Sequence, residues 1–251
     1  MDMLDKWKYY DIRFARHLLC NPINPSRFEA FCRRLNLELG AHVLDIGCGK
    51  GEFLVRLVEL YGVSGVGVDK SPYCTSDALV KKASRVPRAM LEFLKMDGAA
   101  YRPKARETFD VAMCIGASWI FGGHSGTLRT LTEMTKSGGY VVAGEAFWRK
   151  KPCDEYLRVT EMTADQFGTH RGNVQIGEDE GLTCIYTLVS NRDDWDHYTT
   201  LGWWSLDEYV RTHPDDPDVP EIVERSKREK MTYLRWQRDT LGWALYLFRN
   251  P

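Results

Sequence analysis

The stretch Val43-Leu44-Asp45-Ile46-Gly47-Cys48-Gly49-Lys50-Gly51 decides the fold of this 251-residue chain. Its apolar first half is typical of a buried strand, and it leads directly into a Gly-x-Gly-x-Gly turn that precedes a helical pattern. Glycines at such a turn let the backbone bend sharply and let a ligand approach with no Cβ in the way. The stretch therefore predicts a strand, a ligand-binding loop and a helix in succession.

Outward from this loop, short β-rich runs alternate with helical stretches. Strands are predicted at residues 43–46, 65–68, 91–95, 110–115 and 140–144, and helices at about 51–61, 72–85 and 125–136. Such alternation predicts right-handed βαβ units and an α/β fold, in which helices cover both faces of a parallel sheet. Two more strands are predicted, at 182–189 and 243–249.

The N-terminal region is predicted to be helical. Its apolar residues recur at helical spacing, which predicts one amphipathic helix over the first twenty residues; they are Leu4, Trp7, Phe14 and Leu18. The segment Ser26–Glu29 has the pattern of a capping box for a second helix, which runs to about Leu37 and which Gly40 ends.

Carboxylates stand near the ends of the first three predicted strands. Asp45 precedes the first glycine, where it repels phosphate but can organise a cationic group such as an amino-acid ammonium. Asp69 ends the second strand, where it can accept hydrogen bonds from ribose hydroxyls. Asp97 ends the third strand, where it can accept a hydrogen bond from an adenine amino group. Glu52 replaces the third glycine of the dinucleotide fingerprint, so a nucleoside carrying an amino acid is favoured over NAD.

These residues resemble the motifs of class I S-adenosylmethionine-dependent methyltransferases. The resemblance covers residues 40–146 and the final strands, and its motifs are Asp45–Gly51, Asp69, Asp97-Gly98, Phe109-Asp110-Val111 and Gly138-Gly139. Residues 115–123 and 144–149 are similar to a narrower bacterial group, the YjhP-type methyltransferases. The resemblance implies a Rossmann-like fold: a seven-stranded, mostly parallel sheet whose last strand is antiparallel, with a helical insertion before that strand.

The resemblance also implies the cofactor and its binding residues. S-adenosyl-L-methionine is the expected methyl donor and S-adenosyl-L-homocysteine the product, with no metal. The glycine loop is expected around the methionine moiety, Asp69 on the ribose, and Asp97 with Gly98 at the adenine. The residues expected to bind the cofactor are Asp45, Gly47, Cys48, Gly49, Gly51, Asp69, Lys70, Asp97, Gly98 and Ile115.

This fold predicts how the chain divides into four parts and where most of its eight tryptophans lie. We expect N-terminal helices that cap the site (1–39), the cofactor-binding core (40–191), a helical lid (192–240) and the final core strand (241–251). Ligands of open parallel sheets bind at the carboxyl ends of the strands, where the lid also begins. The expected substrate-pocket residues are Trp119, Trp148, Trp195, Tyr198, Trp203 and Trp204. The alternative is that these rings only hold the insertion on the sheet.

Two titratable residues at strand ends are the predicted catalytic groups. Methyl transfer from a sulfonium is an in-line displacement, for which the protein supplies alignment, exclusion of water and, for a protonated acceptor, a base. Glu145 closes the fifth strand and can take a proton or pair with a substrate ammonium, unless it forms a structural ion pair. His124 begins the helix after the fourth strand, where the alternative is a bond to the backbone.

Composition narrows the partners. Lys and Arg number 34 against 35 Asp and Glu, so no global positive field attracts a nucleic acid. No apolar run reaches the roughly 18 residues that span a membrane, and seven scattered cysteines without a CxxC pair suit reduced thiols in the cytoplasm. We therefore expect a cytoplasmic enzyme with a small-molecule acceptor; an RNA or protein methyltransferase and a non-catalytic S-adenosylmethionine-binding protein are the alternatives. The oligomeric state is left open.

Overall fold

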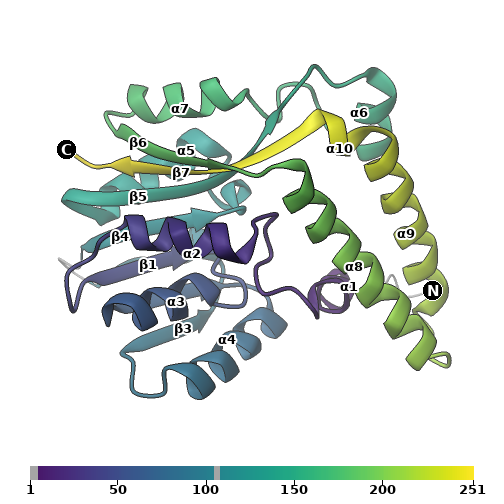
Figure 1. Ribbon diagram of the computed structural model, residues 1–251, viewed down its shortest axis with the longest axis horizontal. Helices are drawn as coiled ribbons and strands as arrows, with labels where there is room; N and C mark the ends of the chain where they lie inside the picture. Colours follow the sequence, from purple (N-terminus) through teal and green to yellow (C-terminus); the bar gives the residue numbers. More distant parts are fainter. Residues whose placement is uncertain (1–4, 105–107) are drawn as a thin grey trace.

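The computed structural model describes residues 5–104 and 108–251, which build one seven-stranded sheet with helices on both faces (Figure 1). The strand order is β3-β2-β1-β4-β5-β7-β6, and β7 alone runs opposite to the other six strands. The strands are β1 (His42–Ile46), β2 (Ser64–Asp69), β3 (Leu91–Lys95), β4 (Phe109–Ile115), β5 (Thr135–Trp148), β6 (Thr183–Val189) and β7 (Leu241–Arg249). The predicted fold class is confirmed.

Side chains on each strand alternate between two apolar layers, as the period of two requires. The helices that cover the sheet are α2 (Pro25–Arg34), α3 (Glu52–Tyr61), α4 (Pro72–Arg85), α5 (His124–Met134) and α7 (His170–Asp179), with short turns η1 (Gly98–Ala100) and η2 (Ser118–Phe121). The short α6 (Asp154–Thr160) contacts α9 (Val219–Thr232) instead. Val43 and Val111 face the layer that holds α2 and α3. Leu44 and Ala112, one residue further along their strands, face the layer that holds α5 and α7.

The N-terminal region differs from its prediction. The first helix, α1 (Lys6–Phe14), ends well before residue 20, and Leu4 lies outside the described residues. The predicted capping box at Ser26–Glu29 is wrong: α2 is capped by Asn24, whose side chain accepts a hydrogen bond of 2.9 Å from the Ser26 amide. Pro25 then starts the helix, since its missing N–H costs nothing in the first turn.

The sequence analysis missed the two helices between β5 and β6. α6 has only seven residues, and α7 contains two glycines, which have low helix propensity. Gly177 is nevertheless needed in α7, because a Cβ there would collide with the Phe248 ring. Tertiary packing therefore decides this segment.

Three helices from the two ends of the chain form a layer beyond the carboxyl ends of the parallel strands (Figure 1). We call this layer the cap; it consists of α1, α8 (Arg192–Thr212) and α9 (Val219–Thr232). A π-helical turn, η3 (Tyr233–Gln237), and the short α10 (Arg238–Thr240) lead from the cap into β7. By contrast α2, which was also expected to cap the site, packs on the sheet.

The cap has its own apolar core and its own ion pairs. Its buried core residues are Tyr9, Ile12, Leu206 and Ile222. Salt bridges join α1 to the insertion at 2.6 Å between Arg13 and Glu229, 2.8 Å between Lys8 and Asp216, and 2.6 Å between Arg16 and Glu208. The first helix and the insertion, which these pairs join across 192 to 216 positions of sequence, therefore form one unit.

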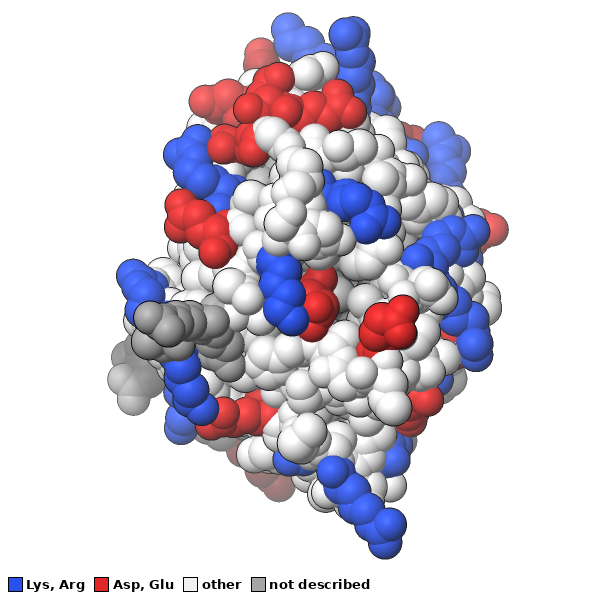
Figure 2. All heavy atoms as spheres, turned by 90° about the vertical axis from the view of Figure 1, so that its left-hand side faces the viewer, with Lys and Arg blue, Asp and Glu red and all other residues white. Residues whose placement is uncertain are grey.

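Charges of both signs are interspersed on the face opposite the cap (Figure 2). That face offers no single-signed stripe along its described residues for a phosphate backbone. No helix in residues 5–104 and 108–251 is long and apolar enough to cross a membrane.

Replacing Ile222 with alanine is expected to lower the free energy of unfolding by about 2–4 kcal/mol, because this side chain is fully buried in the cap core. Chemical denaturation measures the loss. Ile185→Ala on β6 is the matched control: its side chain is 43% exposed, so a loss under about 1 kcal/mol is expected. Equal losses in the two variants would show that the cap core adds little stability.

Candidate active site

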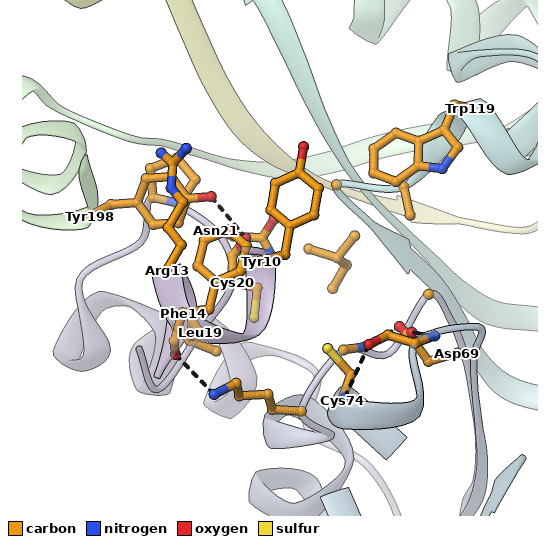
Figure 3. A pocket seen from close by; sticks show the side chains of 18 of the residues that line it. Tyr10, Arg13, Phe14, Leu19, Cys20, Asn21, Asp69, Cys74, Trp119 and Tyr198 are labelled. Carbon is orange, nitrogen blue, oxygen red and sulfur yellow. Dashed lines mark hydrogen bonds between the residues drawn. The ribbon is translucent and has the colours of Figure 1, made fainter. Parts of the chain in front are cut away.

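A cavity of about 1160 Å³ lies between the carboxyl ends of the strands and the cap (Figure 3). One wall comes from the loops after β1, β2, β3 and β4, and the other from α1, α8, α9 and η3. All but one of the expected cofactor residues line it: Asp45, Gly47, Cys48, Gly49, Lys70, Asp69, Asp97, Gly98 and Ile115. The structure thus brings together residues spread over about seventy positions of sequence.

The glycine loop is held in a shape that other residues resist. Gly47 and Gly49 have φ of 72° and 51°, in the left-handed region that favours glycine. A Cβ on Gly47 would lie 2.7 Å from the Cβ of Ala117, so the loop is pressed against the segment after β4. The Gly49 amide donates a hydrogen bond of 2.8 Å to Asp69, which ties the loop to the end of β2.

Gly51 is the exception among the expected cofactor residues, because it lies outside the cavity lining. It precedes α3 with φ of 69°, and a Cβ there would lie 2.8 Å from the Phe93 ring and 2.9 Å from the Cβ of Ala78. Its glycine is required for the turn and for close packing on β3 and α4.

Asp45 is a buried carboxylate whose oxygen Oδ1 has no hydrogen-bond partner. Burial, together with the nearby charge of Asp69, raises the pKa of Asp45 well above its usual range. An unpaired carboxylate in such surroundings is costly, and a bound cation removes that cost. The Asp45 carboxylate in the cavity lining therefore fits a ligand with a positively charged group.

The other two strand-end carboxylates are already partly engaged. Asp69 accepts hydrogen bonds of 2.8 Å from the amides of Gly49 and Ser71, and burial raises its pKa. Asp97 accepts from the Ala99 amide at 3.0 Å and pairs with Lys70 at 2.8 Å, which lowers the pKa of Asp97. Asp97 and Lys70 form an exposed pair, whereas Asp69 is an inner anchor of the loop.

Four of the six expected pocket aromatics line the cavity; these are Trp119, Trp195, Tyr198 and Trp203. Trp148 and Trp204 lie outside it, which differs from the expectation. The Trp148 ring is buried against Phe167, and its indole N–H donates to the Ala164 carbonyl at 2.9 Å. Trp204 points out of α8, where the Arg16 guanidinium lies 5.0 Å from its ring centroid.

Glu145 and His124, the expected catalytic pair, also lie outside the cavity lining. They are buried and face each other, with His124 Nδ1 3.9 Å from Glu145 Oε2, and neither of these two atoms has a hydrogen-bond partner. His124 Nε2 lies 3.1 Å from the Asn173 carbonyl oxygen, and Glu145 accepts from the Ala146 amide at 2.9 Å. Burial lowers the pKa of His124 to about 4 and raises that of Glu145.

Ser118 lies near both this pair and the cavity wall. It lowers the pKa of Glu145 against the larger effect of burial, and it begins η2, whose next residue, Trp119, lines the cavity. Side chains alternate between the two faces of the sheet along β5, which explains why Glu145 was expected in the cavity but lies outside it. A residue near the end of a strand can project to either face, and only the register decides which.

Sequence reasoning expected N-terminal helices over the site but named none of their residues as site residues. Tyr10, Asp11, Arg13, Phe14, Cys20 and Asn21 all line the cavity, as do Cys74 and Trp243. The signal for α1 was present in the i, i+4 pair Tyr10 and Phe14, whose rings stack at 6.0 Å. Such a pair is equally typical of a core face, so the sequence did not single it out.

Comparison with known proteins agrees with this geometry. Residues 43–139 match the family model "Methyltransferase domain". The chain is 28% identical to the Escherichia coli protein YjhP over 246 residues, 97% of this chain and 98% of that protein. It is 30% identical to trans-aconitate 2-methyltransferase of Paracidovorax citrulli over 148 residues, 55% of this chain and 54% of that enzyme. A solved S-adenosylmethionine-dependent methyltransferase of Geobacter sulfurreducens, in complex with S-adenosyl-L-homocysteine, superposes with a TM-score of 0.90 at 27% identity, covering 96% of this chain and 97% of that one.

The sheet order and the glycine loop are those of a Rossmann-like class I methyltransferase. The chain carries this domain and is an S-adenosylmethionine-dependent methyltransferase, similar over nearly its whole length to YjhP. Within the described residues no group of His, Cys, Asp and Glu side chains is arranged to hold a metal ion.

The buried pair makes stability depend on pH in a defined direction. A carboxyl group whose pKa is raised in the native state holds a proton that the unfolded chain has lost, so its contribution to stability falls as pH rises. Glu145→Gln removes that loss. The stability of wild type relative to the variant is therefore expected to fall between pH 5 and pH 8, with a slope of up to about 1.4 kcal/mol per pH unit.

Urea denaturation of both proteins at the two pH values measures this difference. His124 is present in both, so the opposite effect of its lowered pKa cancels. A difference that does not change with pH would contradict a desolvated Glu145.

Proposed function

We propose that this enzyme transfers the methyl group of S-adenosylmethionine to a small-molecule acceptor held between the glycine loop and the cap. The observation that carries the proposal is the cavity, in which the cofactor residues expected from sequence face an aromatic wall on the cap. The similarity to trans-aconitate 2-methyltransferase, over about half of each chain, supports an acceptor of this class.

Several residues of this chain fit the cofactor. The unpartnered oxygen of Asp45 suits a cationic group, and the backbone at Gly47 and Gly49 allows close approach. Asp69 keeps lone pairs for ribose hydroxyls beside its two amide bonds, and Asp97 with Gly98 lies where the adenine is expected. The cofactor supplies an electrophilic methyl group on a sulfonium.

The chain's own contribution is alignment, exclusion of water and control of protons. The cap covers the site and keeps water from the acceptor, and its ion pairs hold α1 and α9 together. Asp11 on α1 lines the cavity, and burial raises its pKa, so we propose it as the group that takes a proton from a protonated acceptor. Glu145 and His124 are proposed to act as positioning residues through Ser118.

We further propose that the enzyme works in the cytoplasm and does not act on nucleic acid. All seven cysteines are free thiols, which supports a reducing compartment such as the cytoplasm. The balance of 34 Lys and Arg against 35 Asp and Glu favours a small acceptor over a nucleic acid.

Transfer of a labelled methyl group from S-adenosylmethionine to fractionated cell extract tests this function. Label is expected in the low-molecular-mass fraction with wild type. Asp45→Asn is expected to lose roughly tenfold or more in cofactor affinity, because a charge-assisted contact contributes about 1.5–3 kcal/mol. Label in the RNA or protein fraction alone would overturn the small-molecule proposal.

Gly47→Ala is expected to weaken S-adenosylhomocysteine binding at least about tenfold, since its Cβ would push Ala117 and the loop apart. Calorimetry measures the affinity. Gly40→Ala is the matched control: Gly40 also has a positive φ, 80°, but nothing lies within 4 Å of an added Cβ and it is not in the cavity. Equal affinity in the two variants would contradict the cofactor's place at this loop.

A further inference from the structure

The mouth of the cavity is surrounded by exposed apolar side chains. Five large hydrophobic residues both line the cavity and remain at least 37% exposed. We call them the rim; they are Tyr10, Leu18, Tyr73, Trp119 and Val159. Because they come from α1, the segment after it, α4, η2 and α6, the rim is not a by-product of one amphipathic helix.

Trp119 is the most exposed member of the rim, at 75%. In Figure 3 the rings of Trp119 and Tyr10 lie on the opposite side of the cavity from Asp69 and Cys74. Exposing a tryptophan to water is unfavourable, and apolar surface gathered at the mouth of a pocket is typical of a site that receives an apolar ligand.

An aromatic path leads inward from the rim. Tyr10 stacks on Phe14 at 6.0 Å between ring centroids, Phe14 lies 5.9 Å from Tyr198, and Tyr198 lies 6.1 Å from Trp195. All four rings line the cavity, and exposure falls from 39% at Tyr10 to 7% at Trp195. The path therefore joins the open rim to a buried end.

Three of the cations in the cavity lining are paired with carboxylates within the protein. Arg13 pairs with Glu229 at 2.6 Å, Lys50 with Asp77 at 2.9 Å, and Lys70 with Asp97 at 2.8 Å. Arg228 is a fourth cation of the lining, but it is exposed to water on α9. A ligand along the path therefore meets aromatic rings and few free cations, which suits an apolar segment better than an anionic one.

The cavity has room for more than one ligand. Its 1160 Å³ exceeds the roughly 300–1,000 Å³ of ordinary small-molecule pockets. We propose that the methyl acceptor is an elongated amphiphile, whose apolar chain or ring system lies along the aromatic path and ends against the rim. This rests on the proposed methyl transfer and specifies its substrate class.

Primary alkanols from butanol to decanol are suitable probes, since they vary chain length at constant head group. We would titrate each into the enzyme with S-adenosylhomocysteine in excess and measure affinity by calorimetry. Affinity is expected to rise about three- to fourfold per methylene, as burial of a CH₂ predicts. Flat affinities across the series would overturn the proposal.

Trp119→Ser tests the rim directly. It is expected to weaken octanol binding about five- to tenfold and butanol binding little, because only the longer chain reaches the mouth. Trp204→Ser is the matched control: its ring is 61% exposed but lies outside the cavity, so neither alkanol nor S-adenosylhomocysteine affinity should change. An equal loss for both alkanols in Trp119→Ser would contradict the place of the chain.

Two further measurements separate this proposal from others. S-adenosylhomocysteine affinity is measured first: if the wild type does not bind it, the proposed function fails, whereas binding without saturable alkanol uptake overturns only the amphiphilic acceptor. If Trp119→Ser loses S-adenosylhomocysteine affinity as well, the ring shapes the cofactor site instead. Sedimentation with phosphatidylcholine vesicles that depends on Trp119, without saturable alkanol binding, would make the rim a membrane-docking surface and would also overturn it.

Discussion

The antiparallel pairing of β7 with β5 is the constraint on which the rest of the structure depends. Nine residue pairs, from Tyr140 opposite Arg249 to Trp148 opposite Leu241, join these strands. Because β7 runs against the other strands, the chain that leaves β6 must return from their carboxyl ends. The whole insertion is therefore placed above the glycine loop, and α1 joins it through the small core around Tyr9 and Ile222. If β7 were parallel to the other strands, the chain leaving β6 would have to cross to the amino ends of the strands before β7 could begin. The insertion would then not have to lie over the site.

Burial gives similar carboxylates different uses in this molecule. Asp45 and Glu145 are both buried near strand ends, and both have a raised pKa and an oxygen without a partner. Asp45 lines the cavity, so a ligand can supply the missing charge. Glu145 faces His124 inside the protein, so ionisation of Glu145 lowers the stability of the folded protein and no ligand in the cavity compensates for it. Access to the cavity, more than residue type, separates a carboxylate that a ligand can reach from one that only the protein surrounds.

The aromatic residues divide in the same way. Trp119 comes shortly after β4 and Trp148 ends the neighbouring β5, yet Trp119 lines the cavity whereas Trp148 is buried against Phe167 and donates its indole N–H to a carbonyl. Trp204 and Trp203 are adjacent on α8, so a turn of about 100° sends one outward and the other to the cavity. The number of aromatic residues suggests an aromatic pocket. The rotation along a helix and the register of a strand decide which of the rings line it.

By itself the sequence determined the parallel core, the glycine loop and the acidic strand ends, because these depend on local patterns: a period of two, left-handed turns that need glycine, and carboxylates at fixed places after strands. It also carried the motifs that led to the methyltransferase family. Only the tertiary structure decided that Gly51 serves packing, that Glu145 lies outside the cavity lining, and which side chains of α1 line the cavity. Those outcomes depend on contacts between residues far apart in the chain, such as Gly51 with Phe93 and Arg13 with Glu229, whose geometry no local pattern encodes.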